Sequence, residues 1–153
     1  MRIGITAMPP ENGVIIEKLA DGMANVKMYR TPIETQQDDG TVMLTADYQV
    51  IKARYTATLA RDVIDHLEYY WSRGVAAELS FAKAQKIAKI EKLLSGTDYK
   101  VAKLAEGWIS EDKYLQLKNR RQEWRDAINA ISAAITLEQV EAVAYDSTVP
   151  STD

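Results

Sequence analysis

Two residues of the chain have the spacing that proton or metal chemistry requires. Asp62 and His66 stand four residues apart, which is one turn of a helix, so they could share a proton or a metal ion. A metal site needs three or more such ligands, and His66 is the only histidine in the sequence. We therefore interpret His66 as a helix-surface residue with local charge pairs.

Carboxylates form the second candidate group. Glu106, Glu111 and Asp112 surround an expected turn between helices, and paired carboxylates can cleave glycosidic bonds. Helix ends also favour acids through the helix dipole, which accounts for these three without catalysis. The seven glycines are isolated, so there is no phosphate loop, and there is no cysteine. We expect no enzyme activity, metal, cofactor or small-molecule substrate.

Basic residues form the third group. Arg120, Arg121 and Arg125 surround Trp124, an arrangement that could contact phosphate groups or stack on a base. Acidic residues such as Glu123 interrupt the group, which is typical of a solvated helix face. The net charge of −3 gives no general attraction for nucleic acid. We expect no nucleic-acid partner, with a protein-interface role for some of these arginines as the alternative.

The elements that carry these residues belong to an ordinary globular chain. It has 153 residues, of which 46% are hydrophobic and 27% charged, so one domain with a real core is expected. The first ten residues lack the apolar run of a secretory signal, and no stretch has the length of a membrane span. We expect a protein with no membrane partner that is made in the cytoplasm.

The first half of the sequence predicts strands. Turn signals at Asn12-Gly13, Asp21-Gly22 and Asp38-Asp39-Gly40 separate strand-like runs. These runs cover 14–16, 23–29 and 41–55, and the change of alternation in the last predicts a bend or bulge near Asp47. We expect an antiparallel hairpin within a sheet of three or four strands, one face of which needs a covering helix or subunit.

The period becomes helical at Leu59. A first helix should end at Ser72-Arg73-Gly74, with Gly74 as a left-handed cap, and a second should run from about 76 to 95 and end at Gly96. The lysines of the second helix, at 83, 86, 89 and 92, should lie on its solvent side. Thr97 or Asp98 begins a third helix, which should end near 106–107.

The last part of the chain predicts a long helix and a short one. Ser110 should cap a helix running to about residue 134, and Thr136 with Gln139 has the spacing of a capping box. The tail 146–153 should be mobile. Along the long helix a heptad-like seam is predicted: Tyr114, Leu117, Arg121, Trp124, Ile128, Ile131 and Ile135. Its partner is either the helix at 76–95 or the same helix in another subunit.

These elements predict an α+β fold, with an N-terminal antiparallel hairpin or small sheet and a helical C-terminal half that ends in a helical hairpin. The β-rich part covers 1–57, and the helical part, 58–145, packs on it as one domain. The aromatic residues exceed what so small a core can hold, and aromatics with arginines favour interfaces. The candidate interaction residues are Trp71, Trp108, Tyr114, Leu117, Arg121, Trp124 and Ile128.

The segment Thr97 to Ile131 carries a more particular pattern. It contains T-D-Y-K-V-A-K-L-A-E followed by R-Q-E-W-R-D-A-I-N. It resembles the C-terminal helical hairpin of small proteins encoded in the tail-gene region of tailed bacteriophages and prophages. The resemblance implies a place in the virion tail, other tail or baseplate proteins as partners, and self-association around the tail axis.

The resemblance implies a non-enzymatic structural protein of the phage tail or baseplate that acts through subunit interfaces. A chaperone for tail or tail-fibre assembly is the first alternative. A small phage regulator that binds a host protein or nucleic acid through Arg120 to Arg125 is the second, and a wall-degrading enzyme using Glu106 is a third.

Overall fold

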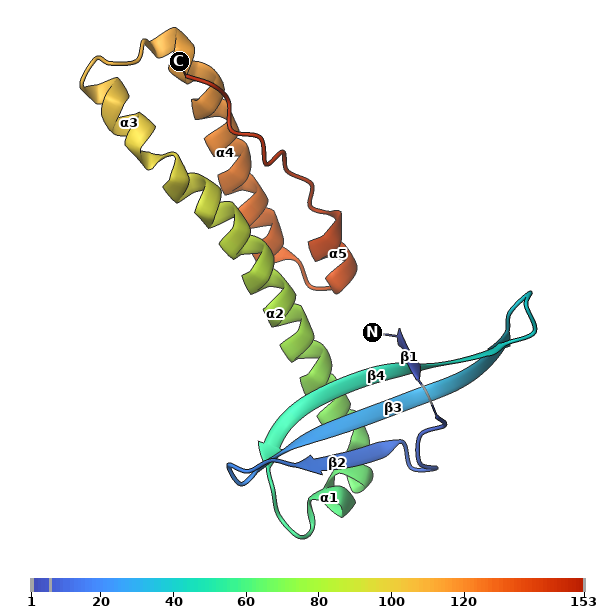
Figure 1. Ribbon diagram of the computed structural model, residues 1–153. Coiled ribbons are helices and arrows are strands. Elements are labelled where there is room, and N and C mark those ends of the chain that lie inside the picture. Colours follow the sequence, from blue (N-terminus) through green and yellow to red (C-terminus); the bar gives the residue numbers. More distant parts are fainter. Residues whose placement is uncertain (1, 6, 153) are drawn as a thin grey trace. The chain divides into compact units, whose positions relative to one another are not determined.

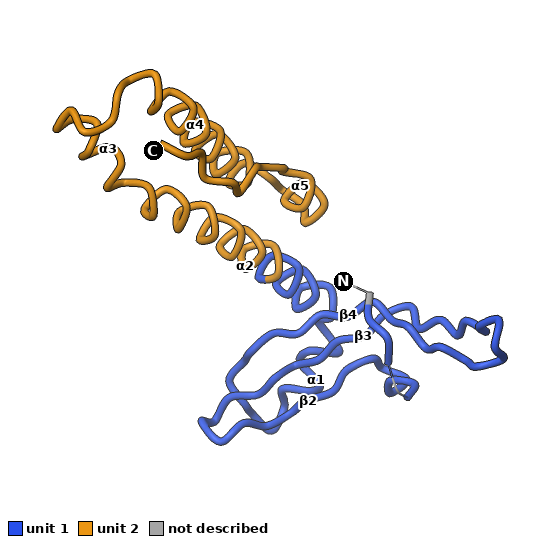
Figure 2. Tube along the Cα trace, turned by 45° about the horizontal axis from the view of Figure 1, so that its top comes forward, with its two compact units in different colours: residues 1–77 blue, residues 78–153 orange. Residues whose placement is uncertain are grey.

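The computed structural model of the protein describes residues 2–5 and 7–152, with strands in the first third and helices after them (Figure 1). The predicted α+β fold is confirmed. Contacts between residues divide the chain into two compact units, Met1–Ala77 and Glu78–Asp153 (Figure 2). Secondary structure changes from strand to helix near the expected boundary at residue 57, whereas the compact units divide later, within a helix.

Unit 1 is built on a four-stranded antiparallel sheet. Its strands are β1 (Arg2–Ile5), β2 (Val14–Lys18), β3 (Met23–Gln36) and β4 (Val42–Arg54), in the order β1-β4-β3-β2. The three predicted strand runs correspond to β2, β3 and β4, and β3 continues seven residues beyond the predicted end at 29. The strand β1 was not predicted, because four residues give too short a pattern to separate it from a loop.

Glycines form two of the predicted turns. Gly40 has φ 82° in the β3–β4 turn, as expected for the Asp38-Asp39-Gly40 signal. Gly13 has φ 66°, and a Cβ there would lie 2.4 Å from the carbonyl oxygen of Tyr29. The glycine at 13 is therefore required both by backbone conformation and by the close approach of β3.

A β-bulge interrupts the β3–β4 ladder. Arg30 pairs with Asp47 and Ile33 with Thr45, so β3 has one extra residue at this point. The sequence placed the irregularity near Asp47, and the structure puts the extra residue in the strand opposite. Thr31 adopts φ 45°, and its Oγ1 donates to the Asp47 carboxylate at 2.7 Å.

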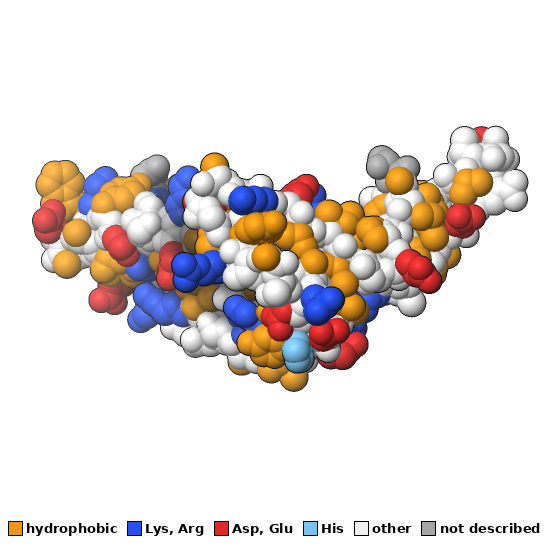
Figure 3. Space-filling view, turned by 90° about the horizontal axis from the view of Figure 1, so that it is seen from below, with side chains coloured by type: hydrophobic (Ala, Val, Ile, Leu, Met, Phe, Trp, Pro, Cys, Tyr) orange, Lys and Arg blue, Asp and Glu red, His pale blue; other side chains and the backbone are white. Residues whose placement is uncertain are grey.

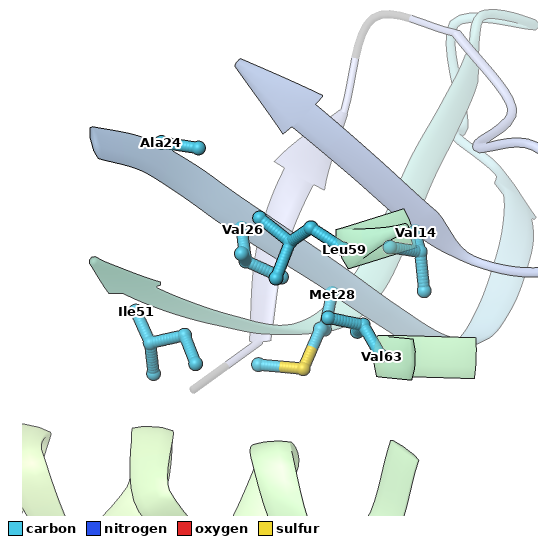
Figure 4. Packing of buried hydrophobic residues seen from close by; sticks show 7 residues of the cluster. All are labelled: Val14, Ala24, Val26, Met28, Ile51, Leu59 and Val63. Atoms are coloured by element: carbon cyan, nitrogen blue, oxygen red, sulfur yellow. The ribbon is translucent and has the colours of Figure 1, made fainter. Parts of the chain in front are cut away.

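The core of unit 1 lies between the sheet and the helix α1 (Leu59–Asp65). Alternate residues of β3, Ala24, Val26 and Met28, are fully buried and belong to one cluster with Leu59 and Val63 of α1 (Figure 4). Alternation with period two is what places every second side chain of β3 on this face. The predicted need for a covering helix is thus met within the chain.

The predicted helix end at Gly74 is wrong. The break falls instead at His66, and the helix α2 (Leu67–Gly96) passes through Gly74 and ends at Gly96 as expected. A Cβ at Gly74 would lie 2.8 Å from Gln49 Oε1 and 3.0 Å from Gln49 Cβ. Position 74 holds a glycine because this turn of α2 lies against β4. Local sequence does not reveal that contact.

Unit 2 is helical. It contains the later part of α2, then α3 (Asp98–Ala105), α4 (Glu111–Ala133) and α5 (Leu137–Ala142). The predicted third and fourth helices are confirmed within one or two residues. The helices α2 and α4 lie side by side (Figures 1 and 2), and Ile90 of α2 shares a buried cluster with Trp124 and Ile131 of α4.

This packing supplies a partner for the predicted seam within the same chain. Most seam residues are buried, but Ile135 is exposed, and Ala127 and Ala134 are buried in the positions next to Ile128 and Ile135. At these two places the buried position is therefore one residue earlier than the predicted seam has it.

The prediction that all four lysines of α2 face solvent is wrong for two of them. Lys83 Nζ donates to the Ser132 carbonyl at 2.8 Å, and Lys86 Nζ donates to the carbonyls of Val140 and Glu141 at 2.7 and 3.1 Å. These carbonyls lie in the last turns of α4 and α5, where a positive charge is favourable. The two lysines join α2 to the ends of both helices.

The predicted cap of the last helix is confirmed. Thr136 Oγ1 accepts a hydrogen bond from the Gln139 amide at 3.2 Å, and Gln139 Oε1 accepts one from the Ile135 amide at 2.7 Å. The segment that the sequence predicts to be mobile, 146–153, contacts α4 in its described part. Trp124 Nε1 donates to the Asp146 carbonyl at 2.7 Å, and Thr152 is buried.

Candidate functional site

The corner between α2, α3 and α4 is held by one buried arginine. Arg121 Nη1 donates to the Leu94 carbonyl at 2.7 Å and to the Thr97 hydroxyl. Its Nη2 donates to Asp98 Oδ1 at 2.7 Å. Because Leu94 lies in the last turn of α2 and Asp98 in the first turn of α3, Arg121 fixes where α3 begins relative to α4.

A small apolar cluster lies beside this corner. Ile109, Tyr114 and Leu117 are buried together, and Leu104 of α3 packs against them. Thr97 is also buried, and its hydroxyl donates back to carbonyls of α2 rather than capping α3 as the sequence predicts. The cluster positions the start of α4 against α3.

A groove opens next to the cluster, between α3 and α4. Its volume is about 440 Å³. The floor is apolar, through Leu104, Tyr114 and Leu115, and charged side chains stand around it. The charged residues that line it are Glu111, Lys118, Arg121 and Arg125.

Trp108 lies in the turn before α4 and is the most exposed of the three tryptophans, at 76%. A second hollow of about 330 Å³ adjoins it, lined by Lys103 and Lys113 among others. We use the name α3–α4 surface for the apolar residues at these two hollows, Leu104, Trp108, Tyr114 and Leu115, of which Trp108 and Leu115 are exposed. Exposed apolar groups of this kind, rimmed by charge, are typical of protein-interaction sites.

The structure separates the predicted interaction residues by burial. Leu117 and Trp124 are fully buried in unit 2, and Tyr114 and Arg121 nearly so. Trp71 and Ile128 are half-buried, Trp71 with the Arg30 guanidinium 4.2 Å from its ring centre. Packing within the chain accounts for these residues, and only Trp108 is broadly exposed.

Several exposed apolar residues of unit 2 were not among the predicted ones. Leu115 is exposed on α4, and Phe81 is exposed on α2. Both lie off the helix stripe that packs inside the unit. In the sequence, both are apolar residues at positions outside the buried stripe of their helix, and this could have identified them.

The acid–base candidates form the local pairs that the sequence predicts. His66 Nδ1 lies 3.2 Å from Asp62 Oδ1, and Tyr70 donates its hydroxyl to the other carboxylate oxygen. This hydrogen bond to the Asp62 carboxylate raises the pKa of Tyr70 above its usual range. Glu111 and Asp112 occupy the first turn of α4, and Glu106 ends α3. Among the described residues, no three metal-ligating side chains stand together.

Two of the three clustered arginines have acidic partners. Arg120 pairs with Glu123 and Asp146, while Arg121 pairs with Asp98. The pKa of Asp146 is lowered, first by the backbone amide of Thr148 and then by the Thr148 side chain and Arg120. Two of the three arginines therefore bind α3 and the tail within the chain.

Hydrophobic and charged side chains of both signs are mixed over the face of the molecule seen in Figure 3. No helix within the described residues is both long enough and apolar enough to cross a membrane. No family model matches the chain, and comparisons with curated proteins and with solved structures also give no match.

Proposed function

We propose that the protein is a non-enzymatic structural component of a bacteriophage tail or baseplate and that it acts by binding other tail proteins. The resemblance of Thr97 to Ile131 to tail-region proteins supports the setting. The α3–α4 surface supports the mode of action, and it lies within the same segment. Binding occurs through this surface, in the assembling virion tail.

The exposed Trp108 is the observation that carries the proposal. A tryptophan at 76% exposure in the bend between α3 and α4 offers a large apolar area, and tryptophan is frequent at the centres of interfaces. Leu115 adds apolar area beside the groove. Lys118 and Arg125 at the rim favour a partner segment that combines apolar and acidic side chains.

An assembly chaperone uses the same surface, and the two roles differ in the fate of the protein. Mass spectrometry of purified particles, with copy number measured against the major tail protein, separates them. A fixed copy number that is a small multiple of the tail symmetry is the result we expect. Absence from particles, together with binding to a free tail protein, would assign the chaperone role.

Variants test the surface itself. Trp108→Ala and Leu115→Asp should each reduce recovery with particles, or with the isolated partner, by about tenfold or more. Ile135→Ala is the matched control, because Ile135 is equally exposed but lies after α4, outside the surface. Circular dichroism should be unchanged for all three variants. Normal recovery of both surface variants would overturn the proposed mode of action.

A regulator that binds through Arg120 to Arg125 has less support, since Arg120 and Arg121 are ion-paired within the chain. Such a regulator would bind duplex DNA with a steep salt dependence that Arg125→Glu abolishes.

A further inference from the structure

The hairpin of β3 and β4 continues beyond the other strands of its sheet (Figure 1). The strand β2 pairs with β3 only as far as Met28, and among the described residues β1 pairs with β4 from Leu44 to Asp47. Every residue from 31 to 43 is exposed, and we call this segment the arm. A two-stranded ribbon with no layer against it is at best marginally stable in water. The arm therefore gains stability from a partner on one of its faces.

One face of the arm combines apolar and acidic side chains. The cross-strand pairs Glu34–Leu44 and Gln36–Val42 place these four side chains on the same face. Val42 is 61% exposed there. The turn adds two aspartates, and the segment from 31 to 43 contains no basic residue. The arm is therefore a negatively charged segment with exposed apolar side chains.

The edge of the arm is unsuited to strand addition. Pro32 has no backbone N–H to donate, and the β-bulge beside it breaks the regular ladder. Proline and bulges are among the features by which sheets protect their edges. We therefore expect a partner to contact a face of the arm through side chains.

The hollows of the α3–α4 surface have the opposite charge. Basic side chains line both of them, Lys118 and Arg125 in the groove and Lys103 and Lys113 beside Trp108. None of these four basic residues forms an ion pair with another residue in the part of the chain that the structure describes. Basic residues outnumber acids among the lining residues. The surface is therefore complementary to an acidic segment with apolar side chains.

We infer that the arm of one copy of the protein binds the α3–α4 surface of another copy. Val42 of the arm packs against Trp108 and Leu115, which are the exposed apolar residues of that surface. The acids of the arm lie near Lys118 and Arg125 of the other copy. Apolar contact and opposite charge thus coincide on the same two segments.

The two contacting surfaces belong to different parts of the chain, so the contact is heterologous. Each copy offers one arm and one α3–α4 surface, and copies add head to tail until a ring closes or a chain continues. This inference rests on the proposed function, because it names a second copy as a partner of the same surface.

The experiment is sedimentation equilibrium of the purified full chain across a wide concentration range. The mass should rise from 17.2 kDa to multiples of that value, and less so at high salt. Val42→Ala and Trp108→Ala should each weaken association by about tenfold. Val50→Ala is the control, because Val50 is exposed on the same strand but lies outside the arm. A wild-type protein that stays monomeric, or equal weakening by Val42→Ala and Val50→Ala, overturns the inference.

Charge exchange tests whether these two segments meet. One variant carries Glu34→Lys and Asp38→Lys, and the other carries Lys118→Glu and Arg125→Glu. Each variant alone sets like charges of arm and surface against each other and should stay monomeric where the wild type associates. In a mixture, each arm meets a surface of opposite charge, so association should return. Two variants with native circular dichroism that do not associate on mixing would contradict the contact.

The sedimentation assay contains no other tail protein, so its result is independent of the particle experiment above. If the protein stays monomeric while Trp108→Ala reduces recovery with particles, the α3–α4 surface binds a different tail protein. The proposed function then stands, and the inference of binding between copies fails.

Discussion

The guanidinium of Arg121, on α4, binds both the end of α2 and the start of α3. Its hydrogen bonds reach a carbonyl, a hydroxyl and a carboxylate, and its own side chain is almost completely buried. A planar group with several fixed donors suits this task, because a lysine ammonium in the same place reaches fewer acceptors in the right directions. Arg121 thus helps to position α3 against α4, together with the apolar cluster around Leu117.

Arg121→Lys should lower the free energy of unfolding by about 1–3 kcal/mol, because Leu94 O or Thr97 Oγ1 loses its buried donor. Urea denaturation followed by circular dichroism measures it. Arg125→Lys is the control, since Arg125 is exposed and should change stability by less than about 0.5 kcal/mol. Equal stability of the two variants would contradict the role given to Arg121.

Gly74 and Gly96 give a second matched pair. Alanine is favoured over glycine in a helix by about 1 kcal/mol. At Gly74 the added Cβ meets Gln49 at 2.8 to 3.3 Å, so Gly74→Ala should instead destabilise by about 1–3 kcal/mol. At Gly96 nothing lies within 4 Å, and Gly96→Ala should be neutral or stabilising. Thermal unfolding compares the two, and a more stable Gly74→Ala protein would show that Gln49 moves freely.

The helical hairpin of α2 and α4 is the element on which unit 2 depends. Its buried cluster takes Trp124, Ala127 and Ile131 from α4 and Ile90 from α2. Lys83 and Lys86 of α2 donate hydrogen bonds to backbone carbonyls in the last turns of α4 and α5. Apolar packing and these charge-assisted hydrogen bonds together hold unit 2.

Ile131 and Ile135 belong to one predicted seam, yet their burial differs completely. Ile131→Ala should lower the free energy of unfolding by about 2–5 kcal/mol, because it leaves a cavity in the core. Ile135→Ala should change it by less than about 0.5 kcal/mol. Chemical denaturation of both variants checks this, and similar losses would mean that Ile135 packs against a second copy.

Much of the fold could be predicted from local signals. Paired strands, the Asp38-Asp39-Gly40 turn, the capping box at Thr136 and most of the α4 stripe follow from spacing alone. The reason for a glycine at position 74 could not be predicted, because Gln49, the residue that it contacts, is distant in the sequence. The same holds for Lys83 and Lys86, whose acceptors lie about fifty residues later in the chain.

The candidate site was predictable only in part. Trp108 was predicted by residue type, but local sequence does not distinguish it from Trp124, whose burial depends on α2 and on the tail. Leu115 and Phe81 were missed, because an isolated apolar residue outside a helix stripe is common on protein surfaces. Leu115 lines the groove between α3 and α4, which only the folded structure shows.

At the scale of the whole molecule, the described residues form one buried apolar cluster in unit 1 and two in unit 2, the larger around Ile90 and Trp124 and the smaller around Leu117. The segment after α5 has no helix or strand, but it serves unit 2 by accepting the indole hydrogen bond of Trp124 at Asp146. The Asp146 carboxylate in turn accepts hydrogen bonds from Thr148 and pairs with Arg120. The contacts of the Asp146 side chain with Arg120 and Thr148 therefore depend on the ionisation of its carboxyl group.

The lowered pKa of Asp146 sets the sign of its pH dependence. The stabilisation is complete above the ordinary carboxyl pKa of 3.8 and is lost as the pH falls through the lower pKa of the folded protein. We expect the Trp124 indole hydrogen to exchange faster with solvent over that interval, measured by nuclear magnetic resonance. Asp146→Asn should remove this dependence. An exchange rate that falls with acidification in the wild type would contradict the assignment.

The boundary between the units, at residues 77 and 78, also bears on how the protein is made. Each unit is one continuous stretch of chain, and the core of the first needs nothing beyond the opening turns of α2. Chains emerge from the ribosome N-terminus first, and domains generally fold as they appear. The sheet can therefore close around Val26 and Met28 while Arg121 and Trp124 have yet to be synthesised, and the helical unit completes its fold on a chain that already carries a finished one.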